Sequence, residues 1–466
     1  MRIHFFGAAR TVTGSNYLLE VNGHKLLLEC GLFQGHRDEA FSRNQSFAYD
    51  PSQIDAAILS HAHIDHSGNL PNLVKNGFHS PIYATDGTAS LADIMLLDAG
   101  HIQEYDIAYV NKRRFRHGLP PVEPLYTLED AAEVKQYFTP VDYDQAFNPV
   151  PGVTARLVEA GHILGSAGVV LDIEENGRKL RFWFSGDIGR MDMPLLRDPV
   201  LPNGDVDYLM MECTYGDTVH PPIEEAFEQF GEVVLDTINR GGKVIVPSFA
   251  VGRTQELVYS LHQMQRNGRL PHIPVYVDSP MAVKTTEVFQ QFSRYFDEET
   301  REFVANGTHP ALAFPHLNYV SSVDESKALN NRREPMIIIS ASGMAETGRI
   351  LHHLKNNIED ARNTIVIVSY QAPDTLGRRL VEQAPVVKIF GENYYRRAKV
   401  VEIHGFSAHA GQDLLVRYAQ AANGHLKGVV LVHGEAKPAA ALQAKFTEAG
   451  VTPPVSYPDQ GQVLEF

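Results

Sequence analysis

Short apolar runs separated by glycine turns make up the first 30 residues of the chain. The runs "RIHFF", "SNYLLEV" and "HKLLLEC" are each about the length of one strand and alternate with "GAARTVTG" and "NG". This pattern predicts antiparallel strands. The apolar run "DAAILS" at 55–60 predicts a further strand, and a helix is expected at 87–99. The segment 101–127 contains prolines and basic residues, so we expect a loop or cap there.

Strands return at "VTARLVEA", "AGVVLDIE", "KLRFWFSGD" and "VDYLMME", and the rhythm changes near residue 213. From there, helical and apolar runs alternate as "PPIEEAFEQFGEVVLDTINRGG", "KVIVPS", "VGRTQELVYSLHQMQRNG" and "PVYVDS". Such alternation predicts a parallel sheet covered by helices. It continues to about residue 391, after which "AKVVEIHGFSAHA" and "LKGVVLVHGE" again read as strands, each leading to a histidine.

The chain is therefore predicted to be an α/β protein with an insertion. One domain is built from 1–212 and 394–466, and 213–393 forms a second domain inserted between them. A length of 466 residues agrees with two domains. No apolar run is long enough to span a membrane, and "MRIHFFGAAR" lacks the apolar region of a signal peptide, so we expect a cytoplasmic protein. Cys30 and Cys213 are expected to be buried apolar residues.

The net charge of −15 argues against a strong nucleic-acid binder, because phosphate contacts need Lys and Arg. Bound divalent cations would add positive charge that this sum omits. Basic clusters occur at 111–118, 330–335 and 394–399, although such clusters are most often solvated faces.

The main chemical signal is "HAHIDH" at 61–66, which follows the apolar run at 55–60. Alternate residues of an extended segment point the same way, so His61 and His63 can bind one ion. Asp65 and His66 lie where a second ion could be held. Imidazole and carboxylate are ligands that zinc accepts, so this run predicts a metal site.

Other predicted strands deliver further ligand types at their ends. His162 follows "RLVEA", Asp187 follows "RFWFSG" and His433 follows "GVVLV". Glycines on both sides of Asp187 allow a sharp backbone turn. Each residue alone is a weak signal, but the repeated pattern supports a shared metal centre.

With these motifs, the chain resembles the metallo-β-lactamase superfamily, whose main metal signature is the His-x-His-x-Asp-His run. The expected fold is an αββα sandwich. The resemblance implies two Zn²⁺ ions, one bound by His61, His63 and His162 and the other by Asp65, His66 and His433, with Asp187 bridging them.

Three features narrow the resemblance to the β-CASP branch of nucleic-acid-processing nucleases. Glu212 follows "DYLMM", His409 lies in "GFSAHA" with His433 in "LVHGE", and the inserted α/β segment of mainly parallel sheet lies between Glu212 and these histidines. The segments "GAARTVTGSNYLL", "HIQEYD" and "SFAVGRTQEL" also fit. The similarity covers essentially the whole chain. It is greatest to bacterial and archaeal stand-alone ribonucleases and extends to the endonuclease subunit of eukaryotic pre-mRNA 3′-end processing.

The resemblance implies hydrolysis of RNA phosphodiester bonds in RNA processing or decay. Two metals would clamp the phosphodiester and activate a water for in-line attack. His409 would protonate the leaving 3′ oxygen, and Glu212 would orient its imidazole. Asp65, Glu212 and His409 are thus the catalytic candidates, and single-stranded RNA is the expected substrate.

Two glycine-containing strand-to-helix turns in the insertion are candidate RNA contacts, because a helix N-terminus presents free N–H groups to phosphate. The candidates in these turns are Ser248, Gly252 and Arg253, then Ser340, Ser342, Gly343 and Arg349. Ser407, two residues before His409, is a further candidate.

Several alternatives stay open. One is another hydrolase on this scaffold, acting on a DNA end or a small thioester or lactone, which the negative charge slightly favours. A catalytically inactive RNA-binding scaffold is disfavoured because every expected ligand position is filled. A diiron oxidoreductase is disfavoured because that group has glutamate where His63 stands. The sequence does not decide three further points. These are whether the protein is an endonuclease or a 5′-to-3′ exonuclease, whether it prefers RNA or DNA, and whether it is a monomer or a homodimer.

Overall fold

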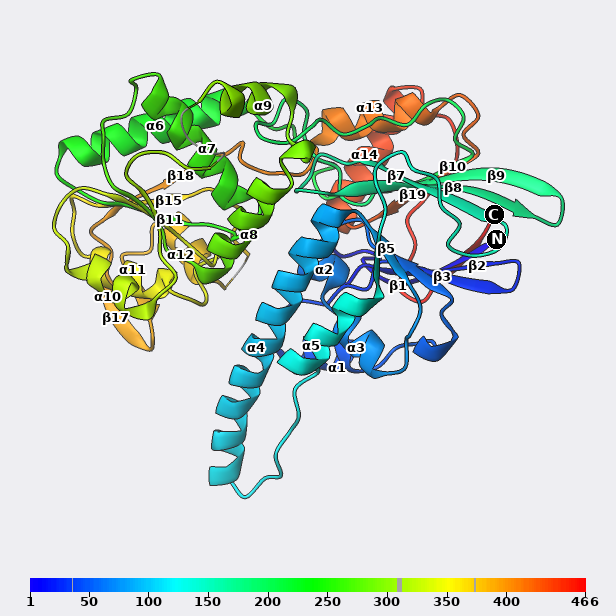
Figure 1. Ribbon diagram of the computed structural model, residues 1–466, viewed down its shortest axis with the longest axis horizontal. Coiled ribbons are helices and arrows are strands. Elements are labelled where there is room, and N and C mark those ends of the chain that lie inside the picture. The colour runs from blue at the N-terminus through cyan, green and yellow to red at the C-terminus, as the bar shows by residue number, and fades with distance from the viewer. Residues whose placement is uncertain (36, 308–311, 373) are drawn as a thin grey trace. The chain divides into compact units, whose positions relative to one another are not determined.

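The computed structural model describes residues 1–35, 37–307, 312–372 and 374–466 (Figure 1). The chain forms two compact units. Unit 1 comprises Met1–Met191, Asp198–Val219 and His409–Phe466, and unit 2 comprises Asp192–Arg197 and His220–Ala408. Among the described residues, no helix combines the length and apolar character needed to cross a bilayer.

Unit 1 contains a seven-stranded and a six-stranded sheet. The first has the order β21 (Val463–Glu465), β1 (Arg2–Gly7), β2 (Asn16–Val21), β3 (His24–Leu28), β4 (Ala56–Ile58), β5 (Ile82–Ala84) and β6 (Phe138–Pro140). The second has the order β20 (Val455–Ser456), β19 (Gly428–Val432), β10 (Tyr208–Glu212), β9 (Arg178–Phe184), β8 (Ala167–Glu175) and β7 (Val153–Glu159). As expected from the turns, β1, β2 and β3 pair antiparallel.

Alternate strand residues form the core of unit 1. Tyr17, Leu19 and Val21 share one face of β2 and pack in the same buried cluster as Leu171 and Phe182 of the second sheet. The opposite face of the second sheet packs against α13 (Gln412–Ala422) and α14 (Ala436–Glu448). The remaining helices of unit 1 are α1 (Arg37–Gln45), α2 (Ile64–Ser67), α3 (Leu70–Lys75), α4 (Asp86–Arg116) and α5 (Leu128–Glu133), with 3₁₀ turns at Pro51–Gln53 and Val134–Tyr137. The predicted αββα sandwich is thus confirmed.

Unit 2 is built on a six-stranded parallel sheet, as the β-α-β alternation predicted. The order is β13 (Leu317–Tyr319), β12 (Val275–Val277), β14 (Ile337–Ser340), β11 (Val244–Pro247), β15 (Thr364–Ile367) and β18 (Lys399–Glu402), and β16 (Val386–Ile389) forms a hairpin with β17 (Glu392–Tyr395). Its helices are α6 (Ile223–Asn239), α7 (Arg253–Arg266), α8 (Pro280–Gln291), α9 (Glu298–Ala305), α10 (Val323–Asn331), α11 (Ile350–Asn357) and α12 (Leu376–Val381), with a 3₁₀ turn at Ser293–Tyr295.

Two features differ from the sequence analysis. The segment 101–127 was expected to be a loop, but α4 is a 31-residue helix that ends at Arg116, so only 117–127 fits that description. No proline occurs between 86 and 116, and the helix continues through the basic run. In addition, β18 pairs parallel with β15 and so belongs to unit 2, which extends to 408, whereas the predicted inserted domain ended at 393.

Candidate metal centre

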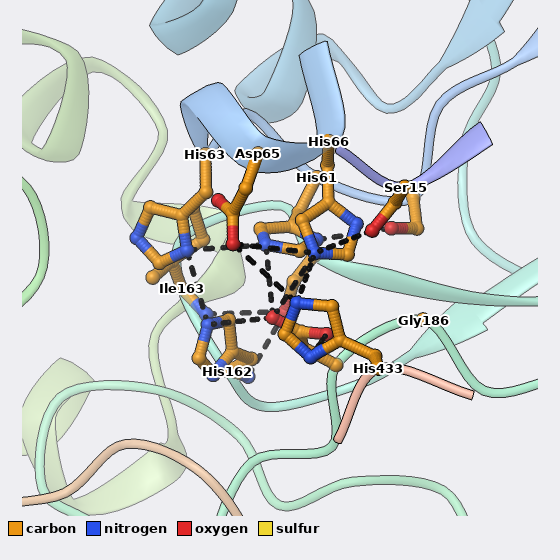
Figure 2. Close-up of polar contacts among 12 residues, drawn as sticks. Ser15, His61, His63, Asp65, His66, His162, Ile163, Gly186 and His433 are labelled. Carbon is orange, nitrogen blue, oxygen red and sulfur yellow. Dashed lines mark hydrogen bonds and ion pairs between the residues drawn. The ribbon is translucent and has the colours of Figure 1, made fainter. Parts of the chain in front are cut away.

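All seven predicted metal ligands lie in unit 1, on segments that follow strands. His61 and His63 come after β4, and Asp65 and His66 lie in α2. The other three follow the second sheet: His162 after β7, Asp187 after β9 and His433 after β19. Figure 2 shows the labelled imidazoles and Asp65 pointing toward a common centre.

Two glycines near Asp187 allow the loops of the site to approach one another. Gly186 has a backbone φ of 57°, a conformation that residues other than glycine rarely adopt. A Cβ on Gly189 would lie 2.0 Å from the carbonyl oxygen of Gly161, which directly precedes His162. The expectation that glycines shape this turn therefore has a specific steric basis.

Three imidazoles form one cluster. The His63 Nδ1 atom lies 3.1 Å from His61 Nε2 and 3.2 Å from His162 Nε2. Burial is the main cause that lowers the pKa of His61 and His162 well below the ordinary value, and it lowers that of His63 to about 4. These imidazoles are therefore neutral at neutral pH, as metal ligands must be.

A second cluster joins Asp65, His66 and His433. The His433 Nε2 atom lies 3.3 Å from His66 Nε2 and 3.4 Å from Asp65 Oδ2. Burial opposes ionisation of Asp65, but the hydrogen bond with His433 and the neighbouring imidazoles lower its pKa. The carboxylate is thus ionised and available as a ligand.

Asp187 lies between the two clusters. Its Oδ2 atom is 3.4 Å from His61 Nε2, 3.6 Å from His162 Nε2 and 3.3 Å from His66 Nε2. Burial opposes its ionisation, but the imidazoles of His433, His66 and His61 hold its pKa well below the usual range. A carboxylate in this position can share its oxygens between two ions.

These distances fit metal coordination. Two nitrogen ligands at about 2.1 Å from a tetrahedral zinc ion lie about 3.4 Å apart, close to the separations found here. Ligand atoms of His61, His63, His162 and Asp187 form one group in which all lie within 4.8 Å of one another, and those of Asp65, His66 and His433 form another. The donor set therefore suits transition-metal binding.

A buried glutamate that the sequence analysis missed supports His66. Glu29 follows β3, has a φ of 66°, and its Oε2 atom lies 2.8 Å from His66 Nδ1. Its other oxygen accepts a hydrogen bond from the Ser60 backbone N–H at 2.6 Å. Carboxylates in this position fix the tautomer of a metal-binding histidine. An acidic residue at the end of "HKLLLE" was the available signal, the same pattern that identified the ligands.

Glu212 and His409, the predicted catalytic pair, are in contact. The His409 Nδ1 atom lies 3.1 Å from both carboxylate oxygens of Glu212. The Ile188 N–H donates to Glu212 Oε1 at 2.6 Å, and Ala410 N–H donates to Ile188 O, so both residues are fixed to the loop that carries Asp187. Burial would lower the pKa of His409, but the Glu212 carboxylate, with Asp187 and Asp65, raises it to about 9.

Comparison with known proteins places this geometry in a family. The Thermus thermophilus protein "Ribonuclease TTHA0252" is 40% identical over 443 residues, which cover 95% of each chain. The chain belongs to the β-CASP branch of the metallo-β-lactamase superfamily. Family models match the superfamily over residues 9–207, the Beta-Casp domain over 254–380, and a "Zn-dependent metallo-hydrolase RNA specificity domain" over 393–456.

Further relatives agree with this placement. "Transcription termination factor FttA" of Methanocaldococcus jannaschii is 31% identical over 443 residues, covering 93% of this chain and 67% of the relative. A crystal structure of a protein of unknown function from Enterococcus faecalis V583 aligns with a TM-score of 0.58 and 13% identity over 99% of both chains, which shows the fold alone. Membership of the superfamily implies a bound metal.

In this β-CASP protein, the first group of candidate RNA contacts lies at the start of α7. Ser248 is fully buried, and Gly252, with a φ of 77°, precedes the first helical residue. Arg253 is buried, forms an ion pair with Glu256, and its guanidinium stacks 5.4 Å from the Phe406 ring centroid. The side chains of Ser248 and Arg253 thus contribute to packing within unit 2.

The second group surrounds a buried aspartate. Ser340 Oγ donates to the Asp278 carbonyl at 2.8 Å, and Arg349 forms an ion pair with the Asp278 carboxylate at 2.7 Å. Ser342 and Gly343 lie in the loop between β14 and α11 rather than at the helix start. Ser407 is half-buried near the end of unit 2. Only Ser342 and Ser407 of the predicted serines are therefore partly accessible.

Proposed function

We propose that this protein is a metal-dependent ribonuclease that hydrolyses phosphodiester bonds of single-stranded RNA, with two Zn²⁺ ions as its cofactors. The observation that carries the proposal is the Glu212–His409 pair beside two adjacent clusters of metal-binding side chains. Two clusters with a shared carboxylate suit phosphodiester chemistry, in which both the attacking and the leaving oxygen need stabilisation.

Metal ions held by these ligands would neutralise charge on the phosphodiester and lower the pKa of a water. Asp65, whose side chain is 24% exposed, can accept a hydrogen bond from that water. His409, 21% exposed, can donate its Nε2 proton to the leaving 3′ oxygen. Glu212 is fully buried and holds Nδ1 of that imidazole, so it orients the proton donor and stabilises its charged form.

Unit 2 would supply part of the RNA-binding surface. The hydroxyls of Ser342 and Ser407 are the groups that we propose for phosphate contacts, whereas Gly252 and Gly343 are buried and would shape their turns. The buried side chains of Ser248, Arg253, Ser340 and Arg349 would act by holding these turns in shape. The name of the Thermus relative supports RNA as the substrate. A cytoplasmic location and a homodimer stay predictions from the sequence.

The test uses 5′-labelled single-stranded RNA with wild-type protein and the His63→Ala variant, each with and without a chelator. We expect wild-type cleavage that the chelator abolishes and the variant lacks. The exposed His425 provides a matched control, since His425→Ala should cleave like wild type. Equal cleavage by wild type and His63→Ala would refute the proposal. Internal fragments would indicate an endonuclease, whereas mononucleotides released from the 5′ end would indicate an exonuclease.

Substrate comparison separates the alternative. Single-stranded DNA, duplex RNA and a small thioester are offered at equal concentration to the metal-loaded protein. We expect the highest kcat/KM for single-stranded RNA. A higher kcat/KM for DNA or for the thioester would favour the alternative, a hydrolase of DNA ends or of small esters on the same scaffold, and would reject RNA as the substrate.

A further inference from the structure

The second half of α4 exposes a row of large apolar side chains. The first half of the helix packs into unit 1 through residues such as Leu91 and Leu96, which are fully buried. Beyond Gly100 the helix extends away from the body of the unit (Figure 1). We call residues 101–119 the arm. Its exposed apolar residues are Ile102, Tyr105, Tyr109, Phe115 and Leu119, and the three aromatic rings are 73%, 70% and 84% exposed.

The end of the arm carries a cluster of positive charge, whereas Glu104 and Asp106 near its start are acidic. Lys112, Arg113, Arg114 and Arg116 lie within one stretch of a chain whose net charge is −15. Arg114 donates to the Pro120 carbonyl at 2.7 Å. Within the described residues, the side chains of the other three take part in no ion pair or hydrogen bond. Three cations are therefore available to an external anion.

Helical geometry combines these two sets of residues. At 3.6 residues per turn, Ile102, Tyr105, Tyr109, Arg113 and Arg116 fall on one side of the helix. The side chain of Asn111 holds the returning chain by two hydrogen bonds of 2.8 Å with the backbone of Val122. The face is thus pre-organised, with aromatic rings near the middle of the helix and cations at its end.

The start of α4, well before the arm, is connected to the loop that carries His162. The hydroxyls of Thr85 and Thr88 donate to the Gly165 carbonyl at 2.6 and 2.8 Å, and Gly165 follows His162 in the same loop. A helix of 31 residues is about 46 Å long. The arm therefore begins about 22 Å along the helix from the end that contacts this loop and extends further from there.

We propose that the arm binds single-stranded RNA outside the metal centre, with bases stacked on Tyr105 and Tyr109 and phosphates bound by Lys112, Arg113 and Arg116. This inference rests on the proposed ribonuclease function. Aromatic rings interspersed with cations are the combination that binds single strands without sequence preference. A protein partner docking on apolar area alone would not require the cations, and the otherwise acidic chain makes their concentration here complementary to a polyanion.

Two sets of variants separate stacking from apolar contact. Tyr105→Phe/Tyr109→Phe keeps the rings, whereas Tyr105→Leu/Tyr109→Leu keeps apolar area and helix propensity but removes the rings. Lys112→Gln/Arg113→Gln/Arg116→Gln removes three charges. The matched control is Arg178→Gln/Lys179→Gln/Lys445→Gln, which removes three exposed charges elsewhere in unit 1. Circular dichroism and thermal unfolding check that every variant folds.

Binding is measured by fluorescence anisotropy in chelator, so that no cleavage occurs, with labelled poly(U) oligonucleotides of about 30 and about 6 nucleotides. For the longer RNA we expect the Leu variant to bind at least about fivefold more weakly, as loss of one stacked base requires. The Phe variant and the control should bind like wild type. In the Gln variant, the slope d log K/d log[salt] should be less steep than in wild type by about 2. The six-nucleotide RNA should be affected less.

Other outcomes would overturn the proposal in distinguishable ways. If wild type binds and cleaves RNA but the Leu and Gln variants bind it equally well, the arm is not an RNA site and the ribonuclease function stands. If the Leu and Phe variants weaken binding equally, base stacking is refuted. If sedimentation shows that the variants dissociate a dimer while RNA affinity is unchanged, the arm is a self-association surface. Failure of wild type to bind RNA in chelator would reject the arm proposal, whereas the ribonuclease function is rejected only if metal-loaded wild type also fails to cleave RNA.

Discussion

Replacing Glu29 by glutamine tests whether the buried carboxylate behind His66 controls metal binding. Glu29 uses both oxygens as acceptors, one for Ser60 N–H at 2.6 Å and one for His66 Nδ1–H at 2.8 Å. Glutamine has the same shape but only one acceptor oxygen. Its NH₂ group must therefore face either the Ser60 N–H or the His66 ring. The side chains of residues 29 and 66 are both buried, so water cannot replace a lost partner.

Each arrangement has a cost that can be measured. If the NH₂ group faces His66, the imidazole must carry its proton on Nε2, the atom that lies 3.3 Å from Asp187 Oδ2 and His433 Nε2. That tautomer cannot bind an ion there. If the NH₂ group faces Ser60, a buried N–H loses its partner at a cost of about 1–3 kcal/mol. Loss of such a supporting group typically weakens metal binding about 10- to 100-fold.

We therefore expect Glu29→Gln to lower the affinity of the cluster of Asp65, His66 and His433 for its ion by about 10- to 100-fold. The affinity of the cluster of His61, His63 and His162 should stay close to that of wild type. Competition with a chromophoric zinc chelator gives the two affinities, and elemental analysis gives the stoichiometry. Glu20→Gln, a half-buried position near His4, is the matched control. A folded Glu29→Gln protein that binds both ions with wild-type affinity would refute the reasoning.

Three further predictions follow from contacts of the same kind. Gly189→Ala should disrupt metal binding, because its Cβ would lie 2.0 Å from the Gly161 carbonyl oxygen; equal zinc content in variant and wild type would contradict this. Glu212→Gln should lower the pKa of His409 from about 9 in metal-free protein, measured by NMR titration, because the raising carboxylate charge is removed. Burial opposes ionisation of Asp278, but its hydrogen-bond partners hold the pKa of its carboxyl below the ordinary value. The ionised carboxylate therefore stabilises the folded protein above the ordinary aspartate pKa, and this stabilisation is lost as the pH falls through the pKa of the folded state. The difference in unfolding free energy between wild type and Asp278→Asn should therefore shrink from about pH 6 to about pH 3, and a constant difference would refute the assignment.

The candidate metal ligands could be selected from sequence because each one follows an apolar strand. That rule needs no knowledge of strand pairing, and it added His162, Asp187 and His433, each a weak signal alone, to the strong signal of the run at 61–66. Glu29 obeys the same rule but was not named among the candidates. Its role becomes visible only in the folded chain, where the Cys30 N–H donates to the His66 carbonyl at 2.8 Å and so holds the end of β3 beside α2.

The extent of α4 and the edge of unit 2 were harder to predict, for different reasons. Helix prediction relies on a buried apolar stripe, and beyond Gly100 the apolar residues of α4 are exposed and mixed with cations. The assignment of β18 depends on its parallel pairing with β15, a long-range contact with no local signature. For β18, the deciding interaction therefore lies outside the window from which a local pattern is read.

The convergence of the metal ligands follows from strand direction, which the sequence does not state. β7 and β9 are both antiparallel to β8, so they run in the same direction, and β10 is parallel to both β9 and β19. The carboxyl ends of β7, β9, β10 and β19 therefore meet at one edge of the sheet, and each is followed by a residue of the site or ends in one: His162, Asp187, Glu212 and His433. If β8 had paired parallel with β7 while staying antiparallel to β9, His162 would lie at the opposite edge from Asp187 and one cluster would lose a ligand. The chemistry of the site is thus encoded in residue types at strand ends, whereas its assembly depends on the order and direction of pairing.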